Sequence, residues 1–429
     1  MLADKMKSLL SCVLAALCAL TVTACSTPCG SPGALCAPIE NVTSPPPRVT
    51  AKAPERPPAP PPEEEAQVET FAVAMPGTMT ADQPAVATGQ PTRIGLLLPL
   101  RSETLGRAAD AVRAGFMAAW ERERAGFDVT VIETGDANED VLATYQTALA
   151  QQDIIVGPLA RSAVTAVATS PLVTKPTIAL NHPEGRDGTA LPAKMLSIGL
   201  SIEEEARQVA EWAAREHPGA NVLILSGSTA WQRRIATAFA AHADKVGLSA
   251  KTLELTALNG YLSDPELVAL RARLAEQPVD LLFAALDADQ ARQLRVALAA
   301  PPLGDIPLYG TSSLNPGRVS MLPGQELDGV KLLDLPWQIQ RDNPAVASYP
   351  RAVPQDEARL SADMERLYAL GIDAFRVARE LATKPGQPIT LDGVTGQLSI
   401  DYGNGPARVK RIEPAAVYRN GVPVPVTTP

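Results

Sequence analysis

The stretch Asp153–Val164, DIIVGPLARSAV, decides the predicted fold of this chain of 429 residues. After Asp153 it is a short β-branched apolar run as far as Val156, Gly157-Pro158 interrupts the run, and a helical pattern follows. This order is typical of a buried parallel strand that leads into a crossover helix. In an open α/β sheet the turn after such a strand lies at the carboxyl edge, where ligands usually bind. The stretch therefore predicts an α/β fold and a candidate binding edge.

The same alternation of strands and helices extends outward from this stretch, from Arg93 to about Asn420. Repeated β-α alternation indicates parallel sheets covered on both faces, and two consecutive sets predict two Rossmann-like lobes. The main strands are expected at Arg93–Leu100, Val129–Glu133, Thr177–Leu180, Met195–Leu200, Val222–Leu225, Thr252–Leu255, Asp280–Leu286, Leu308–Gly310 and Val330–Trp337, a long helix at Ala358–Leu381, and a final hairpin from Gly396–Asp401 and Ala407–Val417.

The N-terminal residues 1–24 have the parts of a secretory signal: two lysines, an apolar run and small residues before Cys25. The apolar run is short for a transmembrane helix. Val22-Thr23-Ala24-Cys25 resembles the bacterial lipobox, which implies that Cys25 is diacylated and becomes the mature N-terminus, held stably by its acyl chains. By the same resemblance, Ser26 favours the outer membrane. The alternative is an ordinary signal peptide in which Cys25 happens to follow an alanine.

Residues 25–91 are rich in Pro, Ala, Thr and Glu and are predicted to be a disordered tether, because such a composition cannot build a core. Its proline runs favour polyproline II, which would let it reach on the order of 200 Å. It is either a stalk that projects the domain through a porous wall layer or a tether without a length requirement. All five cysteines lie at or before Cys36, so Cys29 and Cys36 either pair or stay as thiols, and the globular part has no disulfide or cysteine metal site.

Charge and motifs argue against several classes of function. The formal net charge is -9 and no basic block is present, which argues against nucleic acid as a partner. The only histidines, His182, His217 and His242, lack metal-binding spacing, and neither a Gly-x-Ser-x-Gly elbow nor a phosphate-binding Gly-x-x-x-x-Gly-Lys loop occurs. We therefore expect no catalytic residue, no metal and no cofactor.

The chain from Arg93 to about Asn420 resembles the type 1 periplasmic-binding-protein fold, including the Leu/Ile/Val-binding group. The segments YALGIDAFRVA (Tyr368–Ala378) and GVTGQLSID (Gly393–Asp401) carry most of this resemblance, and RIGLLLPL, DIIVGPL, TIALN, NVLILSGS and VDLLFAALD add to it. The resemblance implies a bilobed domain over 92–420, with lobe 1 from about 92–200 and 328–386, lobe 2 from about 201–327 and 387–420, and a tail at 421–429.

Within that superfamily, the lipobox, the tether and the Gly-Pro-Leu turn are most similar to the penicillin-binding-protein activator lipoproteins of the outer membrane. The resemblance implies a protein that binds and stimulates a class A penicillin-binding protein, a peptidoglycan synthase. The best-known members carry an N-terminal helical-repeat domain, and this chain has its proline-rich segment at that place.

Six residues that follow predicted strands are the candidates for a ligand site at the carboxyl edge. Arg161 and Ser162 open the helix after Gly157-Pro158, where the N–H groups of a helix N-terminus could bind a carboxylate. Leu159 and Ala160 stand where relatives that bind amino acids place hydroxyl groups, which favours a structural turn instead. The other candidates, each also a natural cap or turn residue, are Asn181, Trp231, Asp287 and Thr311.

Three functions follow from these observations, in order of support. The first is a non-enzymatic outer-membrane lipoprotein, facing the periplasm, that activates a class A synthase. The second is a solute-binding lipoprotein that takes an amino acid or a similar small molecule in an interlobe cleft and serves a transporter or receptor. The third is a wall-degrading enzyme, for which the sequence offers no candidate acidic residue.

Overall fold

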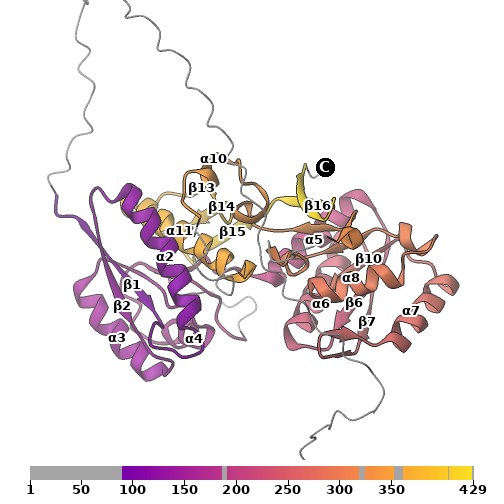
Figure 1. Cartoon of the computed structure of the whole chain (residues 1–429). Helices are drawn as coiled ribbons and strands as arrows, with labels where there is room; N and C mark the ends of the chain where they lie inside the picture. The colour runs from indigo at the N-terminus through magenta and orange to yellow at the C-terminus, as the bar shows by residue number, and fades with distance from the viewer. Residues whose placement is uncertain (1–88, 186–190, 318–323, 352–360, 404, 428–429) are drawn as a thin grey trace, which may run out of the picture. The chain divides into compact units, whose positions relative to one another are not determined.

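The first sheet is built around the opening stretch and is entirely parallel (Figure 1). The computed structural model describes residues 89–185, 191–317, 324–351, 361–403 and 405–427. Within them the strand order is β2-β1-β3-β4-β5, and one helix separates each strand from the next in the chain from β1 to β4. The elements are β1 (Thr92–Leu98), α2 (Gly106–Glu123), β2 (Phe127–Glu133), α3 (Asn138–Gln151), β3 (Ile154–Val156), α4 (Arg161–Thr169), β4 (Thr177–Ala179) and β5 (Met195–Ser197).

The second sheet has the order β17-β16-β12-β11-β10-β6-β7, in which the strands from β12 to β7 are parallel. Strand β16 pairs antiparallel with β12, and β17 pairs antiparallel with β16. The elements of the second sheet and its helices are α5 (Ile202–Glu216), β6 (Asn221–Gly227), α6 (Ala230–Ala243), β7 (Ser249–Leu255), α7 (Asp264–Glu276), β10 (Leu281–Ala285), α8 (Ala288–Ala297), β11 (Leu308–Gly310), β12 (Lys331–Leu333), β16 (Ala415–Arg419) and β17 (Val422–Val426), with a small hairpin of β8 (Ala257–Leu258) and β9 (Tyr261–Leu262).

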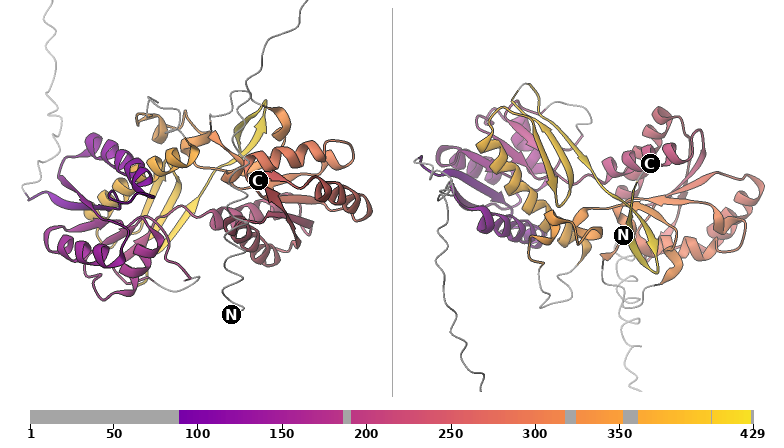
Figure 2. Two further views of the ribbon diagram at one scale, coloured as in Figure 1. Left: turned by 60° about the horizontal axis from the view of Figure 1, so that its bottom comes forward. Right: turned by 90° about the horizontal axis from the view of Figure 1, so that it is seen from above.

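The C-terminal part adds one long helix and a three-stranded antiparallel sheet, which lies beside that helix (Figure 2). The predicted final hairpin is confirmed as far as Ile412, since Gly396–Asp401 pairs with Arg408–Ile412. The expected strand over Ala407–Val417 is wrong beyond that point, because Ala415–Val417 belongs to β16 of the second sheet. The remaining elements are α9 (Pro336–Ile339), α10 (Pro344–Ala347), α11 (Ala362–Thr383), β13 (Ile389–Gly393), β14 (Gly396–Asp401), β15 (Arg408–Ile412) and the 3₁₀ turns η1 (Asp244–Val246), η2 (Leu303–Asp305), η3 (Ser312–Leu314) and η5 (Gln325–Leu327).

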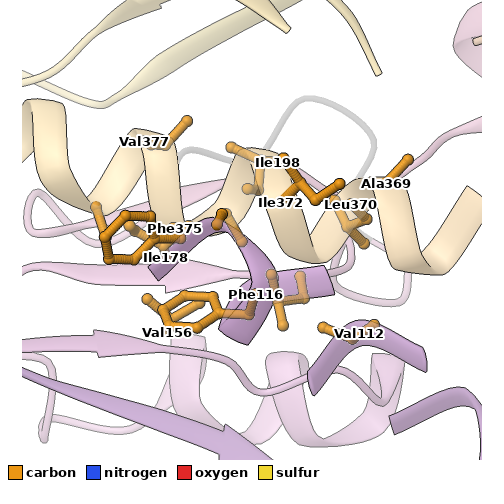
Figure 3. Close-up of a cluster of buried hydrophobic side chains, with 14 of the residues drawn as sticks. Val112, Phe116, Val156, Ile178, Ile198, Ala369, Leu370, Ile372, Phe375 and Val377 are labelled. Atoms are coloured by element: carbon orange, nitrogen blue, oxygen red, sulfur yellow. The ribbon is translucent and has the colours of Figure 1, made fainter. Parts of the chain in front are cut away.

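Helices α2 and α11 cross at two glycines in the core of the first sheet. A Cβ atom on Gly115 would overlap the backbone of Tyr368, and one on Gly371 would overlap the backbone of Val112. The contact lets Phe116 and Phe375 meet edge to face, with ring centroids 5.4 Å apart, above the strands of the first sheet (Figure 3). Aromatic rings prefer this geometry to a face-to-face sandwich.

Three strands, β12, β13 and β14, belong to the other lobe from the one expected. Strand β12, expected with lobe 1, pairs with β11 and β16 in the second sheet. The apolar side chains of β13 and β14, expected with lobe 2, are buried in the core of the first sheet together with α11. The boundary near residue 328 therefore moves to about 334, and the one near 387 to about 413. Sequence spacing could not show this, because strand pairing joins residues far apart in the chain.

Two local predictions are wrong at segments that contain prolines. The strand expected over Val330–Trp337 stops at Leu333, because Pro336 starts the short helix α9, a position that suits its fixed φ. The expected tail at 421–429 contains an edge strand, β17, paired with β16. Pro423 and Pro425 alternate with valines along β17. The two N–H groups that these prolines lack would have pointed to the same side of the strand, which is tolerated on an edge strand.

Candidate functional site

The turn after β3 positions the first candidate residues. Gly157 has φ +118, and a Cβ atom there would overlap the carbonyl oxygen of Leu97 on the neighbouring strand, so glycine is required. Leu159 points into the core and is buried. Helix α4 then begins at Arg161 without a side-chain cap, and Ser162 is exposed. The turn thus presents one guanidinium and one hydroxyl, while the position next to Gly-Pro serves packing.

Asn181 joins the turns after β3 and β4. Its Nδ2 donates to the carbonyl oxygen of Leu159 at 3.1 Å, and its Oδ1 accepts from the N–H of His182 at 2.9 Å. Both ends of the amide are therefore used inside the protein. The imidazole of His182 makes contacts of 3.1 Å with the carbonyl oxygen of Gly199 and 3.2 Å with Ser197 Oγ, and burial lowers its pKa.

Arg161 lies near the start of α5, where sequence reasoning named no site residue. Glu203 in the first turn of α5 accepts from Arg234 Nε at 2.8 Å. Burial opposes the ionisation of Glu203, but the hydrogen bond from Arg234 and the charge of Arg161 outweigh it, so the pKa of Glu203 is lowered. The charge of Arg161 also acts on His182. Glu203 thus contacts Arg234 directly and interacts electrostatically with Arg161 and His182, which lie on two other elements.

Two candidates of the second sheet, Asp287 and Thr311, are used in helix caps. Asp287 caps α8, accepting from the N–H of Gln290 at 2.9 Å. Gln290 in turn accepts from Gln232 Nε2 at 2.6 Å, which ties the turn after β10 to the start of α6. Trp231, beside Gln232, is partly exposed. Thr311 is fully buried, and its hydroxyl lies 2.9 Å from Ser313 Oγ in the turn after β11.

A buried ion pair fixes the place where the chain leaves the second sheet. Asp334 follows β12 and has no exposed surface, and Arg366 on α11 donates to both of its carboxylate oxygens at 3.0 and 2.8 Å. Arg366 also donates to the carbonyl oxygens of Ser312 and Asn315. One guanidinium thus holds together α11, the turn after β11 and the chain after β12.

Two hollows in the described part of the chain contain none of the predicted site residues. One, of about 290 Å³, lies on the three-stranded sheet beside Thr390, Ser399 and Lys410. The other, of about 120 Å³, lies at the start of β6 and β7 beside Lys251. In the described ranges, no group of three or more His, Cys, Asp or Glu side chains is placed to hold a metal ion.

Comparison with known proteins gives a family model and a curated relative. The family model described as "LppC putative lipoprotein" matches residues 70–421. Penicillin-binding protein activator LpoA of Photobacterium profundum is 24% identical over 351 residues, which cover 74% of this chain and 54% of that protein. This chain therefore spans about half the length of the curated relative.

Solved structures match over most of the chain. The C-domain of LpoA (YraM) from Haemophilus influenzae, described as a regulator of PBP1A, has a TM-score of 0.62 and 20% identity, covering 78% of this chain and 100% of that chain. A protein of Chromobacterium violaceum ATCC 12472, described as "a putative branched-chain amino acid ABC transporter", has a TM-score of 0.61 and 35% identity, covering 76% and 100%. These matches confirm the predicted type 1 periplasmic-binding-protein fold.

Proposed function

Because this chain belongs to the LppC family, we propose that it is a non-enzymatic lipoprotein that regulates peptidoglycan synthesis by binding and activating a class A penicillin-binding protein. The observation that carries the proposal is the family match over 70–421, together with a curated relative named as a penicillin-binding protein activator. That relative is about twice as long as the matched region, so the activity is transferred here as a proposal.

The side chains at the carboxyl ends of the strands favour a role in protein contact over a role in solute binding. Leu159 is buried in the core, and Asn181, Asp287 and Thr311 spend their polar groups on neighbouring turns and helix caps. A site for a small polar ligand needs a few convergent polar groups that still have hydrogen bonds to offer. A fold whose strand ends are internally satisfied suits a scaffold that presents surface to another protein.

The anchor remains part of the proposal. Cys25, the signal peptide and most of the tether lie outside the described residues. Among the residues that are described, no helix is both long and apolar enough to span a membrane. We propose attachment to the outer membrane through acyl chains on Cys25, which C25A would abolish, moving the protein from the membrane to the soluble fraction of the periplasm.

Binding to the synthase is tested by pull-down. The chain from Ser26 onward, immobilised through its C-terminus, should retain at least one class A penicillin-binding protein of the source bacterium. A solute-binding lipoprotein of similar charge, immobilised in the same way, should retain none. If no class A synthase is retained at micromolar concentration, the proposed partner is wrong.

The second candidate function is supported by the relative from Chromobacterium violaceum, which is matched over its whole length at 35% identity. Arg161, Ser162 and Trp231 still present partly or fully exposed side chains. If the chain captures an amino acid, the ligand should raise Tm, because it binds only the folded state. This rise in Tm should disappear in R161A. The activator function instead predicts no rise in Tm with any of the twenty amino acids, and R161A should bind the synthase as well as the natural chain does.

A further inference from the structure

Five buried charged side chains gather where the chain passes between the two sheets. We call this region the junction, and it comprises residues 198–205, 334–335 and 411–414 together with Arg366 of α11. Its buried charged side chains, each less than a tenth exposed, are Glu205, Asp334, Arg366, Arg411 and Glu413. Three are acidic and two are basic, so the burial of one negative charge is left without a matching cation.

The two arginines spend their hydrogen bonds away from the glutamates. Arg366 pairs with Asp334, as described above. Arg411 donates from Nη1 and Nη2 to the carbonyl oxygens of Gly199 and Ile198, at 2.9 and 2.6 Å, and from Nε to Thr395 Oγ1 at 3.2 Å. These bonds fasten β15 to the strand end after β5. The carboxyls of Glu205 and Glu413 therefore have charged groups nearby, but neither carboxyl accepts a hydrogen bond from an arginine of the described residues.

The two glutamates are poorly satisfied as carboxylates. Glu205 Oε2 accepts from the N–H of Ser312 at 2.8 Å. Glu413 Oε2 is buried and has no hydrogen-bond partner among the described residues, and the same holds for Gln208 Nε2. The N–H of Glu413 donates to Gln208 Oε1 at 3.2 Å, and Gln208 lies one turn after Glu205 on α5. The chain between β15 and β16 is thus attached to α5 through Gln208, one turn from Glu205.

We propose that the Glu205–Glu413 pair holds a proton at neutral pH, and that losing this proton loosens the attachment of the β15–β16 connection to α5. The connection between the two sheets is then sensitive to pH. A buried carboxyl without a counter-ion is more stable as the neutral acid, because desolvation penalises the charged form.

Electrostatics agree with this geometry. Burial raises the pKa of Glu205 to about 7, against the hydrogen bond from Ser312. Burial also raises the pKa of Glu413, and the charge of Glu205 raises it further. The charged groups that act on the pair are Asp334 after β12, Arg366 on α11 and Arg411 on β15, and Asp373 on α11 acts on Arg411.

The direction of the pH effect follows from these raised pKa values. Between the unfolded pKa, near 4.5, and the raised folded pKa, the folded state binds more protons than the unfolded chain. Stability from the pair is therefore full at low pH and is lost as the pH rises through the folded pKa. The junction should be firmer at pH 6 than at pH 8.

Hydrogen–deuterium exchange on the whole chain tests the proposal. After correction for intrinsic exchange rates, protection at 408–417 and 202–209 should fall on the order of tenfold from pH 6 to pH 8. E205Q and E413Q should each reduce this fall, because a neutral amide has no proton to lose. E204Q is the matched control, since Glu204 lies beside Glu205 but is exposed, and it should behave like the natural chain. Equal protection at both pH values in the natural chain would overturn the proposal.

A second measurement does not depend on any variant folding. With ¹³C-labelled glutamate carboxyls in the natural chain, at least one carboxyl resonance should titrate above pH 6. If every glutamate resonance titrates below pH 6, the pair holds no proton at neutral pH and the proposal is wrong.

Discussion

At the scale of single residues, the buried pair of Asp334 and Arg366 carries the connection between the second sheet and α11. Arg366 joins this carboxylate to the carbonyl oxygens of Ser312 and Asn315, and Asn315 Nδ2 also donates to Asp334 at 2.7 Å. A buried pair of this kind is costly to break, because removing one partner leaves the other charged and desolvated.

We expect R366M to lower the free energy of unfolding by about 3–5 kcal/mol. The matched control is R113M, which removes the exposed pair that Arg113 makes with Asp110 and should cost under about 1 kcal/mol. Urea unfolding followed by circular dichroism measures both values. Equal losses in the two variants would show that the buried pair contributes no more than a surface pair.

At the scale of elements, the crossing of α2 and α11 depends on the absence of two side chains. Gly371 sits where the backbone of Val112 passes, and helix propensity alone would favour alanine there by about 1 kcal/mol. The close approach outweighs this preference, because an extra methyl group would push the helices apart and disturb the contact between Phe116 and Phe375.

G371A should therefore destabilise the fold by about 1–3 kcal/mol, despite its better helix propensity. G106A at the start of α2 is the control, because the nearest atom to a Cβ there is 3.5 Å away, which is ordinary contact. We expect G106A to be neutral or slightly stabilising. A thermal melt in which G371A is as stable as the natural chain would contradict the assignment of this contact.

The elements also show what the sequence could and could not predict. The strand, turn and helix at 153–164, and the caps at Ser201 and Asp287, were predictable because their signals lie within a few residues. The site was predicted less well: Arg161 was named, but Glu203 and Arg234 were missed, and so was Arg411 of the junction. Their contacts join residues far apart in the chain, as the bond from Arg411 to Ile198 does. Only Glu203 carried a local signal, and its position in the first turn of a helix is already accounted for by the helix dipole.

At the scale of the whole molecule, the fold of a solute-binding protein is combined with strand ends that are mostly satisfied internally. Asn181 and Asp287 show this at single positions. This combination and the family match support a regulatory partner of a synthase. A pH-sensitive junction would then act on the scaffold that presents the binding surface.

Glycan polymerisation by purified class A penicillin-binding proteins tests this account most directly. Lipid II would be supplied to each synthase of the source bacterium with and without an equimolar amount of the chain from Ser26 onward, and the length and rate of glycan formation would be measured. We predict a several-fold rise in rate with at least one synthase, and none with the chain unfolded by heat. An unchanged rate with every synthase, at concentrations that saturate binding, would contradict the proposed function.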